Sequence, residues 1–198
     1  MQAAGYVLVG GNSSRMGRDK AFLPGQFRYV LDDVAERVEA ATGNATLIGD
    51  PDRYHEFRYP CIPDFRPGLG PLSGLETALI NTNFDLNLVL ACDMPGVELT
   101  HLRSLLERAR ISNTGCVAIQ DVTGKVHPLC AVYKKECLPV IQCRLDGKRL
   151  ALMGLLDEVS TEYVRVQSVI ENINTPEEWA RWRSKEHNGF QSAWQTVT

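Results

Sequence analysis

A glycine-rich loop that directly follows a short apolar run constrains this chain more than any other stretch. The apolar run, Tyr6 to Val9, predicts a buried strand, and the loop runs from Gly10 to Lys20 as Gly-Gly-Asn-Ser-Ser-Arg-Met-Gly-Arg-Asp-Lys. Glycines let backbone N–H groups face a ligand, and arginine and lysine supply fixed positive charge for phosphate oxygens. The pattern therefore predicts a triphosphate-binding loop at the end of a strand. An ordinary glycine turn is the alternative.

This loop differs from two common phosphate-binding motifs. It does not end in Gly-Lys-Ser/Thr, so it is not a Walker A loop. Gly10 and Gly11 are adjacent and no Gly-x-x-Gly follows, so it is not a dinucleotide-binding fingerprint either.

Short apolar strands alternate with amphipathic helices along the chain through Ile119. Apolar residues from Phe27 to Val38 recur at helical spacing and predict a helix that ends near Thr42-Gly43, and a second strand follows at Ala45 to Ile48. This βαβ order implies parallel pairing of the strands. We predict a three-layer α/β sandwich with a mostly parallel, Rossmann-like sheet. One domain should span residues 1–184, and the polar residues 185–198 should form a mobile tail.

Charge and apolar content argue against several classes of function. The net charge of −3 provides no broad basic surface, so we expect no nucleic-acid partner. We find no apolar run long enough to span a bilayer and no signal-peptide pattern, so we expect a cytoplasmic protein with no membrane partner. The six cysteines include no Cys-x-x-Cys pair, which indicates buried free thiols rather than a zinc site or a disulfide framework.

A second loop, rich in glycine and proline, runs from Pro63 to Leu75 and contains Asp64 and Gly70. Pro71 suits the first turn of a following helix. The N-terminus of such a helix would offer N–H groups and a positive dipole end to an anion or a polar base. The alternative is a loop that only leads into a structural helix.

Asp93 follows the strongest apolar run of the chain, Leu86 to Ala91, which predicts a central strand. This places Asp93 at the carboxyl end of a strand, where ligands bind in open α/β sheets. Mg²⁺ prefers hard carboxylate oxygens and usually binds through one or two carboxylates together with substrate phosphates. Asp93 is thus a candidate Mg²⁺ ligand, with a simple turn residue as the alternative.

These motifs together resemble the nucleotidyltransferase family that includes the molybdenum cofactor guanylyltransferases. The resemblance rests on Gly-Gly-x-x-x-Arg-Met-Gly-x-Asp-Lys in the first loop and on Gly70-Pro71-Leu72-Ser73-Gly74-Leu75 in the second. It also rests on Asp-x-Pro at Asp93 and on Pro-Leu-x-x-Val-Tyr at Pro128, and it extends from about Val7 to about Trp182.

The resemblance implies a set of site residues. The nucleotide contacts of the family fall on Leu8, Val9, Gly10, Gly11, Lys20, Asp64, Gly70 and Asp93. The catalytic residues are Arg15, Lys20 and Asp93, and the Mg²⁺ ligands are Asp93 and Asn174. A family asparagine that contacts nucleotide falls near Gly49 here, so that contact is absent or made by backbone.

Other positions are assigned from the local pattern. Thr100 is expected to cap a helix, and His127 is expected to be a loop residue without a catalytic role. Lys148 and Arg149, expected at the start of a helix, bind an anionic pterin phosphate or a sulfur-rich substrate, or else form a solvated face. Thr175, Pro176 and Glu178 predict a capping box at the start of a last helix.

The implied reaction transfers GMP from GTP to the phosphate of molybdenum-bound molybdopterin, with Mg²⁺ as cofactor and pyrophosphate as product. Molybdopterin is thus the expected partner besides GTP, along with other cofactor-biosynthesis proteins and recipient molybdoenzymes. Two alternatives stay open. One is another nucleotidyltransferase that uses CTP and molybdopterin or a sugar or polyol phosphate, and the other is a non-catalytic GTP-binding protein that delivers the cofactor.

Overall fold

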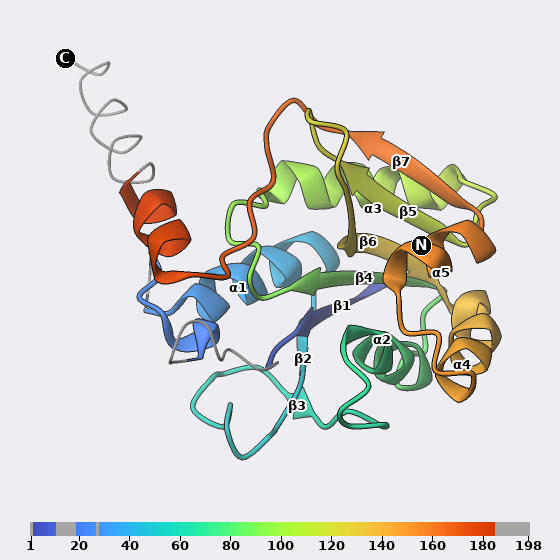
Figure 1. Ribbon diagram of the computed structural model, residues 1–198, viewed down its shortest axis with the longest axis horizontal. Coiled ribbons are helices and arrows are strands. Elements are labelled where there is room, and N and C mark those ends of the chain that lie inside the picture. Colours follow the sequence, from blue (N-terminus) through green and yellow to red (C-terminus); the bar gives the residue numbers. More distant parts are fainter. Residues whose placement is uncertain (1, 11–18, 27, 185–198) are drawn as a thin grey trace.

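A seven-stranded sheet forms the centre of the computed structural model, which describes residues 2–10, 19–26 and 28–184 (Figure 1). The strand order across the described sheet is β3-β2-β1-β4-β6-β5-β7. The strands are β1 (Ala3–Leu8), β2 (Thr46–Ile48), β3 (Cys61–Ile62), β4 (Leu86–Ala91), β5 (Cys116–Gln120), β6 (Val126–Lys134) and β7 (Thr161–Arg165).

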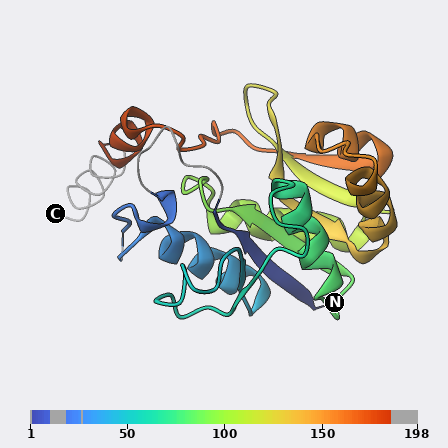
Figure 2. The same cartoon turned by 60° about the horizontal axis from the view of Figure 1, so that its bottom comes forward.

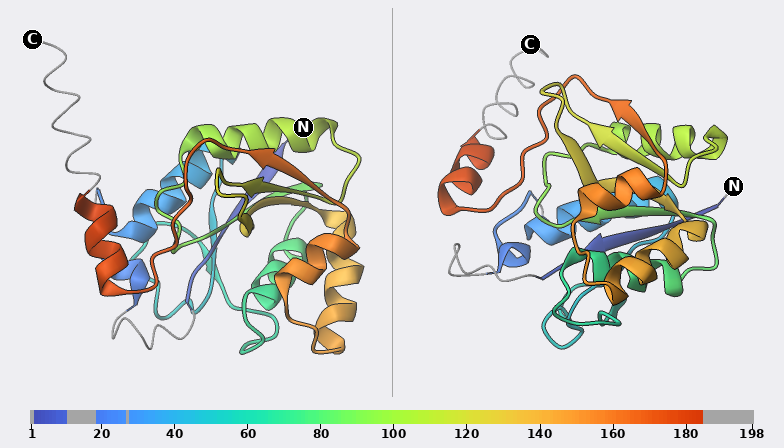
Figure 3. Two further views of the ribbon diagram at one scale, coloured as in Figure 1. Left: turned by 45° about the horizontal axis from the view of Figure 1, so that its top comes forward. Right: turned by 45° about the vertical axis from the view of Figure 1, so that its right-hand side comes forward.

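Helices cover both faces of the sheet, which makes the three layers that the sequence predicts (Figures 1 and 3). One face carries α1 (Val30–Thr42) and α3 (Leu99–Ile111), whose apolar side chains share one core cluster. The other face carries α2 (Pro71–Ile80), α4 (Leu138–Asp146) and α5 (Leu152–Glu158), which share a second cluster. Because both faces are covered, the central strand β4 is buried along its whole length, and its residues are apolar except for Asn87, whose amide donates to the Tyr133 carbonyl.

The described sheet is mostly parallel, as predicted, with β6 as its antiparallel strand. β6 pairs antiparallel with both β4 and β5, whereas the other neighbouring strands pair in parallel. All the other described strands therefore point the same way, and their carboxyl ends meet at one edge. A tight hairpin turn between Gln120 and Val126 reverses the chain into β6, with Gly124 in the left-handed region at φ +85°.

After β7 the chain returns across the molecule through an irregular segment, residues 166–175, which we call the strap. Figure 2 shows the strap running from β7 to a helix at residues 176–184, near the short helix η1 (Lys20–Phe22). The predicted capping box starts this helix, because Thr175 Oγ1 accepts from the Glu178 N–H and the Glu178 carboxylate accepts from the Thr175 N–H. The predicted tail, residues 185–198, lies outside the described residues.

Two local predictions are wrong. The N-cap of α3 is Glu98, two residues before the predicted Thr100, and Glu98 forms a capping box with His101. Lys148 and Arg149 lie in the turn between α4 and α5 and not at a helix start, because Gly147 ends α4 and Leu152 begins α5. Arg149 pairs at 2.6 Å with Glu158, the last residue of α5.

All six cysteines are free thiols, and four of them are buried as expected, while Cys61 is half-buried and Cys143 exposed. Over residues 2–10, 19–26 and 28–184, no helix combines the length and the apolar content that a membrane span needs.

Candidate active site

A cleft of about 600 Å³ opens at the carboxyl ends of β1 and β4, beside the N-terminus of α2. The predicted nucleotide contacts that the structure describes all line it, whereas Gly11 and Arg15 lie outside the described residues. The lining residues are Leu8, Val9, Gly10, Asp19, Lys20, Arg53, Asp64, Gly68, Gly70, Pro71, Ala91, Cys92, Asp93 and Leu129.

Lys20, Asp93 and Asn174 meet at one end of this cleft, although they come from three distant parts of the chain. The Lys20 ammonium donates to Asn174 Oδ1 at 2.7 Å and lies 3.5 Å from Asp93 Oδ2. The other carboxylate oxygen of Asp93 accepts from Asn172 Nδ2 at 3.2 Å, and the Asp93 carbonyl accepts from the Ile173 N–H at 2.8 Å. The strap is therefore docked onto the end of β4. Asn172 was missed in the sequence, although it stands two residues before Asn174.

The donor set at this point fits a hard divalent cation such as Mg²⁺. Oxygens of Asp93 and Asn174 both face the Lys20 ammonium, so two hard oxygen ligands already converge on a positive charge. Within the described parts of the chain, no group of three or more His, Cys, Asp or Glu side chains is arranged to hold a metal ion. Mg²⁺ usually binds through one or two carboxylates together with substrate phosphates, and Asp93 with Asn174 fits such a partial ligand set.

Asp19 fixes the position of Lys20 rather than facing the cleft as an open carboxylate. One oxygen caps η1 by accepting from the Ala21 N–H at 3.1 Å. The other accepts from the Tyr54 hydroxyl and the Arg53 Nε, both at 2.7 Å. Burial and the neighbouring Asp19 carboxylate both raise the pKa of Tyr54, so this hydroxyl stays a donor.

Arg53 is a second cation of the cleft, and the sequence analysis did not identify it. Its side chain is 47% exposed, so the guanidinium keeps access to the cleft while Nε binds Asp19. Arginine has five N–H donors, and no other hydrogen-bond partner for them appears among the described residues. The terminal nitrogens are thus placed to donate to a ligand.

Asp64 presents an acceptor without a partner. Its Oδ1 is buried and has no hydrogen-bond partner among the described residues, and burial raises the pKa of this carboxyl. Gly74 of α2 lies beside it: a Cβ at Gly74 would stand at an ordinary contact distance of 3.4 Å from Asp64 Oδ1 and at a tighter 3.1 Å from Leu8 Cδ2. The loop is tied to α2 by hydrogen bonds from the Phe65 N–H to Thr77 Oγ1 and from the Arg66 N–H to Ser73 Oγ.

The N-terminus of α2 has the geometry that the second loop predicts. Gly70 is the N-cap, at φ 72° in the left-handed region where a side chain would be strained, and Pro71 occupies the first turn. Behind the cleft, a Cβ at Gly49 would stand 2.6 Å from Val9 Cγ2, so only glycine fits there. A smaller cavity of about 420 Å³ adjoins the cleft at Gly49, Arg53 and Asp64.

His127 is not a loop residue, contrary to the prediction. It is the second residue of β6, and its side chain is 3% exposed. Its Nε2 lies 3.0 Å from Asp121 Oδ2. Burial lowers the pKa of His127 more than the Asp121 carboxylate raises it, so the imidazole is neutral near pH 7. His127 does not line the cleft. That it has no catalytic role stays a prediction.

Comparison with known proteins places this arrangement in a family. Residues 5–161 match the MobA-like NTP transferase domain. A probable molybdenum cofactor guanylyltransferase of Bacillus subtilis is 32% identical, over 95% of this chain and 98% of that protein. A second one, from Flavobacterium johnsoniae, is 28% identical over 87% of this chain and 92% of that protein.

A solved structure has the same fold. The crystal structure of molybdopterin-guanine dinucleotide biosynthesis protein A from Archaeoglobus fulgidus superposes with a TM-score of 0.75 at 22% identity. The match covers 90% of this chain and 95% of that one.

Proposed function

Because this chain belongs to the MobA-like NTP transferase domain family, we propose that it transfers GMP from GTP to the phosphate of molybdenum-bound molybdopterin. The observation that carries the proposal is the meeting of Lys20, Asp93 and Asn174 at the end of the cleft. The choice of substrates rests on the relatives that are named molybdenum cofactor guanylyltransferases.

The proposed reaction needs charge neutralisation more than a protein nucleophile. An oxygen of the acceptor phosphate forms a bond to the α-phosphorus of GTP, and the bond from that phosphorus to the bridging oxygen breaks, which releases pyrophosphate. The acceptor phosphate is already an oxyanion, so no general base is required. Lys20 would bind the triphosphate and neutralise the charge that develops on the leaving pyrophosphate. Gly11 and Arg15, beyond the described residues, stay predicted partners of the same phosphates.

Asp93 and Asn174 would hold Mg²⁺, because their oxygens already face a cation in this structure. A bound Mg²⁺ supplies positive charge to the phosphate oxygens. Asn172 orients the Asp93 carboxylate by donating to its other oxygen, so one oxygen stays directed at the Lys20 side of the site.

Asp64 supports the preference for guanine. Guanine carries two neighbouring N–H donors on one edge, and an ionised carboxylate can accept from both. The Asp64 Oδ1 has no partner among the described residues, so a base with such donors would satisfy a buried acceptor. Cytosine and adenine each offer an amino group but no adjacent ring N–H in their common tautomers, and should bind more weakly.

A nucleotide panel tests this function directly. Calorimetry with GTP, CTP, ATP and UTP in the presence of Mg²⁺ should give the tightest binding for GTP, and pyrophosphate should be released only when molybdopterin is added. Tighter binding of CTP would support a cytidylyltransferase, and turnover with a sugar or polyol phosphate would support that alternative. Binding of GTP without any pyrophosphate release would indicate a cofactor-delivery protein.

We also propose a cytoplasmic location, which the four core cysteines without disulfides support. The expected partners are the enzymes that supply molybdopterin and the molybdoenzymes that receive the dinucleotide.

A further inference from the structure

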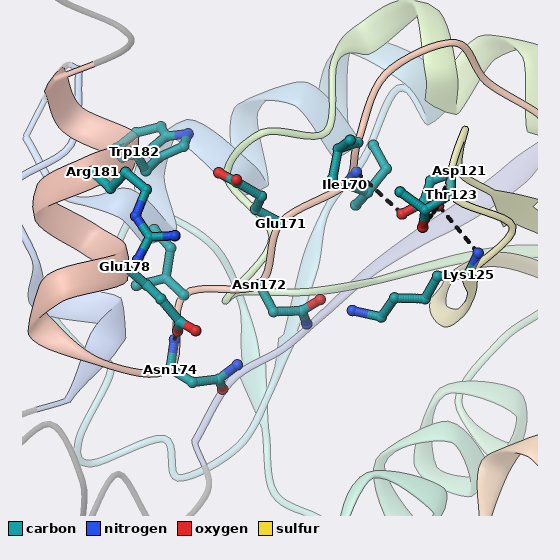
Figure 4. A pocket seen from close by; sticks show the side chains of 12 residues that line it. Asp121, Thr123, Lys125, Ile170, Glu171, Asn172, Asn174, Glu178, Arg181 and Trp182 are labelled. Carbon is teal, nitrogen blue, oxygen red and sulfur yellow. Dashed lines mark hydrogen bonds between the residues drawn. The ribbon is translucent and has the colours of Figure 1, made fainter.

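A second cavity, of about 260 Å³, lies beside the cleft and is formed by three segments (Figure 4). These segments are the hairpin turn between β5 and β6, the strap, and the helix at residues 176–184. Nothing in the proposed GTP site uses the hairpin turn or this helix.

The strap connects the cavity to the reacting centre. Asn172 and Asn174 both line the cavity, while Asn172 donates to Asp93 and Asn174 accepts from Lys20. A ligand that reaches Asn172 from the cavity side is therefore one side chain away from Asp93. A phosphate bound beside Asn172 would therefore lie close to the groups proposed to hold the triphosphate.

Two cations line the cavity. Figure 4 shows the Lys125 side chain extending from the hairpin turn toward Asn172, and Arg181 on the helix at the other end. No ion pair of either side chain occurs among the described residues.

The acidic groups of the cavity are already engaged. Glu178 accepts from the backbone N–H groups of Asn174 and Thr175, at 2.6 and 3.1 Å. Asp121 accepts hydrogen bonds from the backbone of the hairpin turn, and Glu171 also has an interaction partner. The two cations of the cavity are thus the charged groups best able to bind an incoming anion.

The hairpin turn holds Lys125 in place. Asp121 Oδ1 accepts from the N–H groups of Thr123 and Lys125 at 2.9 and 3.1 Å. Asp121 Oδ2 faces His127 Nε2 at 3.0 Å and the Ile170 N–H of the strap at 3.5 Å. These hydrogen bonds lower the pKa of Asp121 despite its burial, so it is ionised. One buried carboxylate therefore fixes the turn both to β6 and to the strap.

We propose that this cavity binds the acceptor, a phosphomonoester of a polar fused heterocycle, and that Lys125 and Arg181 bind its anionic groups. The proposal rests on the proposed function for the identity of the acceptor. Lys125 guides the acceptor phosphate toward Asn172 and Asp93, where it meets the α-phosphorus of the nucleotide. Arg181 binds the far end of the acceptor.

Two charge-removing variants with matched controls test this assignment. Lys125→Ala is compared with Lys135→Ala, since both are exposed lysines directly before and directly after β6, and Arg181→Ala is compared with Arg103→Ala, since both arginines are exposed on helices. Loss of a charge-assisted hydrogen bond should raise the KM for molybdopterin about tenfold or more in each test variant. The KM for GTP and the Kd of Mg·GTP should change less than about twofold, as should every constant of the two controls.

Binding of molybdopterin without GTP provides a readout that is independent of turnover. The full-length protein should bind it, and Lys125→Ala should weaken that binding about tenfold, with an unchanged thermal unfolding midpoint. Unchanged molybdopterin binding in both test variants, or no binding to the wild-type protein, would overturn the cavity assignment. An equal loss of GTP affinity would assign Lys125 to the nucleotide instead, and would also overturn it. Molybdopterin binding at Lys125 without GMP transfer would instead leave the cavity standing and refute the proposed reaction.

Discussion

Lys20→Ala should leave the protein folded while removing most of its turnover. The side chains of Lys20 and Asp93 are 17% and 21% exposed, and their charged atoms are 3.5 Å apart. At an effective dielectric constant of ~20, the gross attraction at that distance is about 5 kcal/mol. Desolvation, side-chain entropy and partial exposure offset most of this, so we expect a net loss of about 1 kcal/mol in the free energy of unfolding.

The expected loss of turnover is larger, because the ammonium stabilises more negative charge in the transition state than in the resting protein. Removal of one preorganised group that stabilises developing negative charge costs about 2–4 kcal/mol. That is a decrease of roughly 30-fold to 1,000-fold in kcat. The stability change alone would not produce such a decrease, since a loss of about 1 kcal/mol leaves nearly all of a typical domain folded.

Pyrophosphate release at saturating GTP, Mg²⁺ and molybdopterin measures this effect, with urea unfolding measured in parallel. Lys134→Ala is the matched control, because Lys134 is also half-buried and donates one hydrogen bond, to the Ser112 carbonyl at 2.8 Å, away from the cleft. It should cost a similar free energy of unfolding and leave kcat within about twofold. Near-normal turnover of Lys20→Ala would refute the role of Lys20, and parallel losses of turnover in both variants would show that stability explains the effect.

Three further variants test separate parts of the argument. Asp93→Asn should decrease Mg²⁺-dependent turnover by about 100-fold or more while changing GTP binding without metal little, and normal turnover at low Mg²⁺ would remove Asp93 from the metal site. Arg53→Ala should raise the KM for GTP about tenfold. Arg58→Ala is the matched control and should not, because Arg58 also lies over the adjacent tyrosine and pairs with a carboxylate but does not line the cleft. Equal effects of the two variants would refute a contact between Arg53 and the nucleotide. Burial lowers the pKa of His127 below its ordinary 6.5. As pH falls from 7 to 5, His127 therefore takes up a proton in the unfolded chain before it does so in the folded protein. The free energy of unfolding of the wild-type protein should then decrease by up to ~1.4 kcal/mol per pH unit because of this group. Urea unfolding of His127→Gln should show a shallower pH dependence in that window, and an identical slope would show that His127 does not titrate as described.

The layered fold was predictable because its elements are marked by periodicity. The alternation of short strands and amphipathic helices predicted the sandwich, and the apolar run from Leu86 to Ala91 predicted the central strand. The direction of β6 was not predicted, although a signal was present. Only five residues, from Asp121 to Lys125, separate β5 from β6, and a parallel strand would need a much longer crossover.

The site was predictable where residues stand next to a recognisable element. Lys20 ends a glycine-rich loop and Asp93 follows a predicted strand, whereas Asp64 was assigned from the family resemblance, and the structure places all three in one cleft. Arg53 and Asn172 lie in irregular segments whose position depends on tertiary contacts, so no local pattern marks them. His127 was assigned wrongly because a histidine before a proline suggests a turn, whereas the buried Asp121 carboxylate gives it a partner inside the sheet.

The topology explains why the two ends of the chain share one reacting centre. β4, β5 and β7 point the same way, so the Asp93 turn, the β5–β6 hairpin turn and the start of the strap all leave the sheet at one edge. From there the strap has to pass Asp93 to reach the helix at residues 176–184, and it binds Asp93 through Asn172 and Ile173. Lys20 then joins the first and last parts of the domain through Asn174, 154 residues later. Displacement of the strap would therefore remove the proposed metal ligand Asn174, which is also the partner of Lys20, and one wall of the proposed acceptor cavity. The proposed metal site, the position of Lys20 and the proposed acceptor cavity thus all depend on the packing of this one segment.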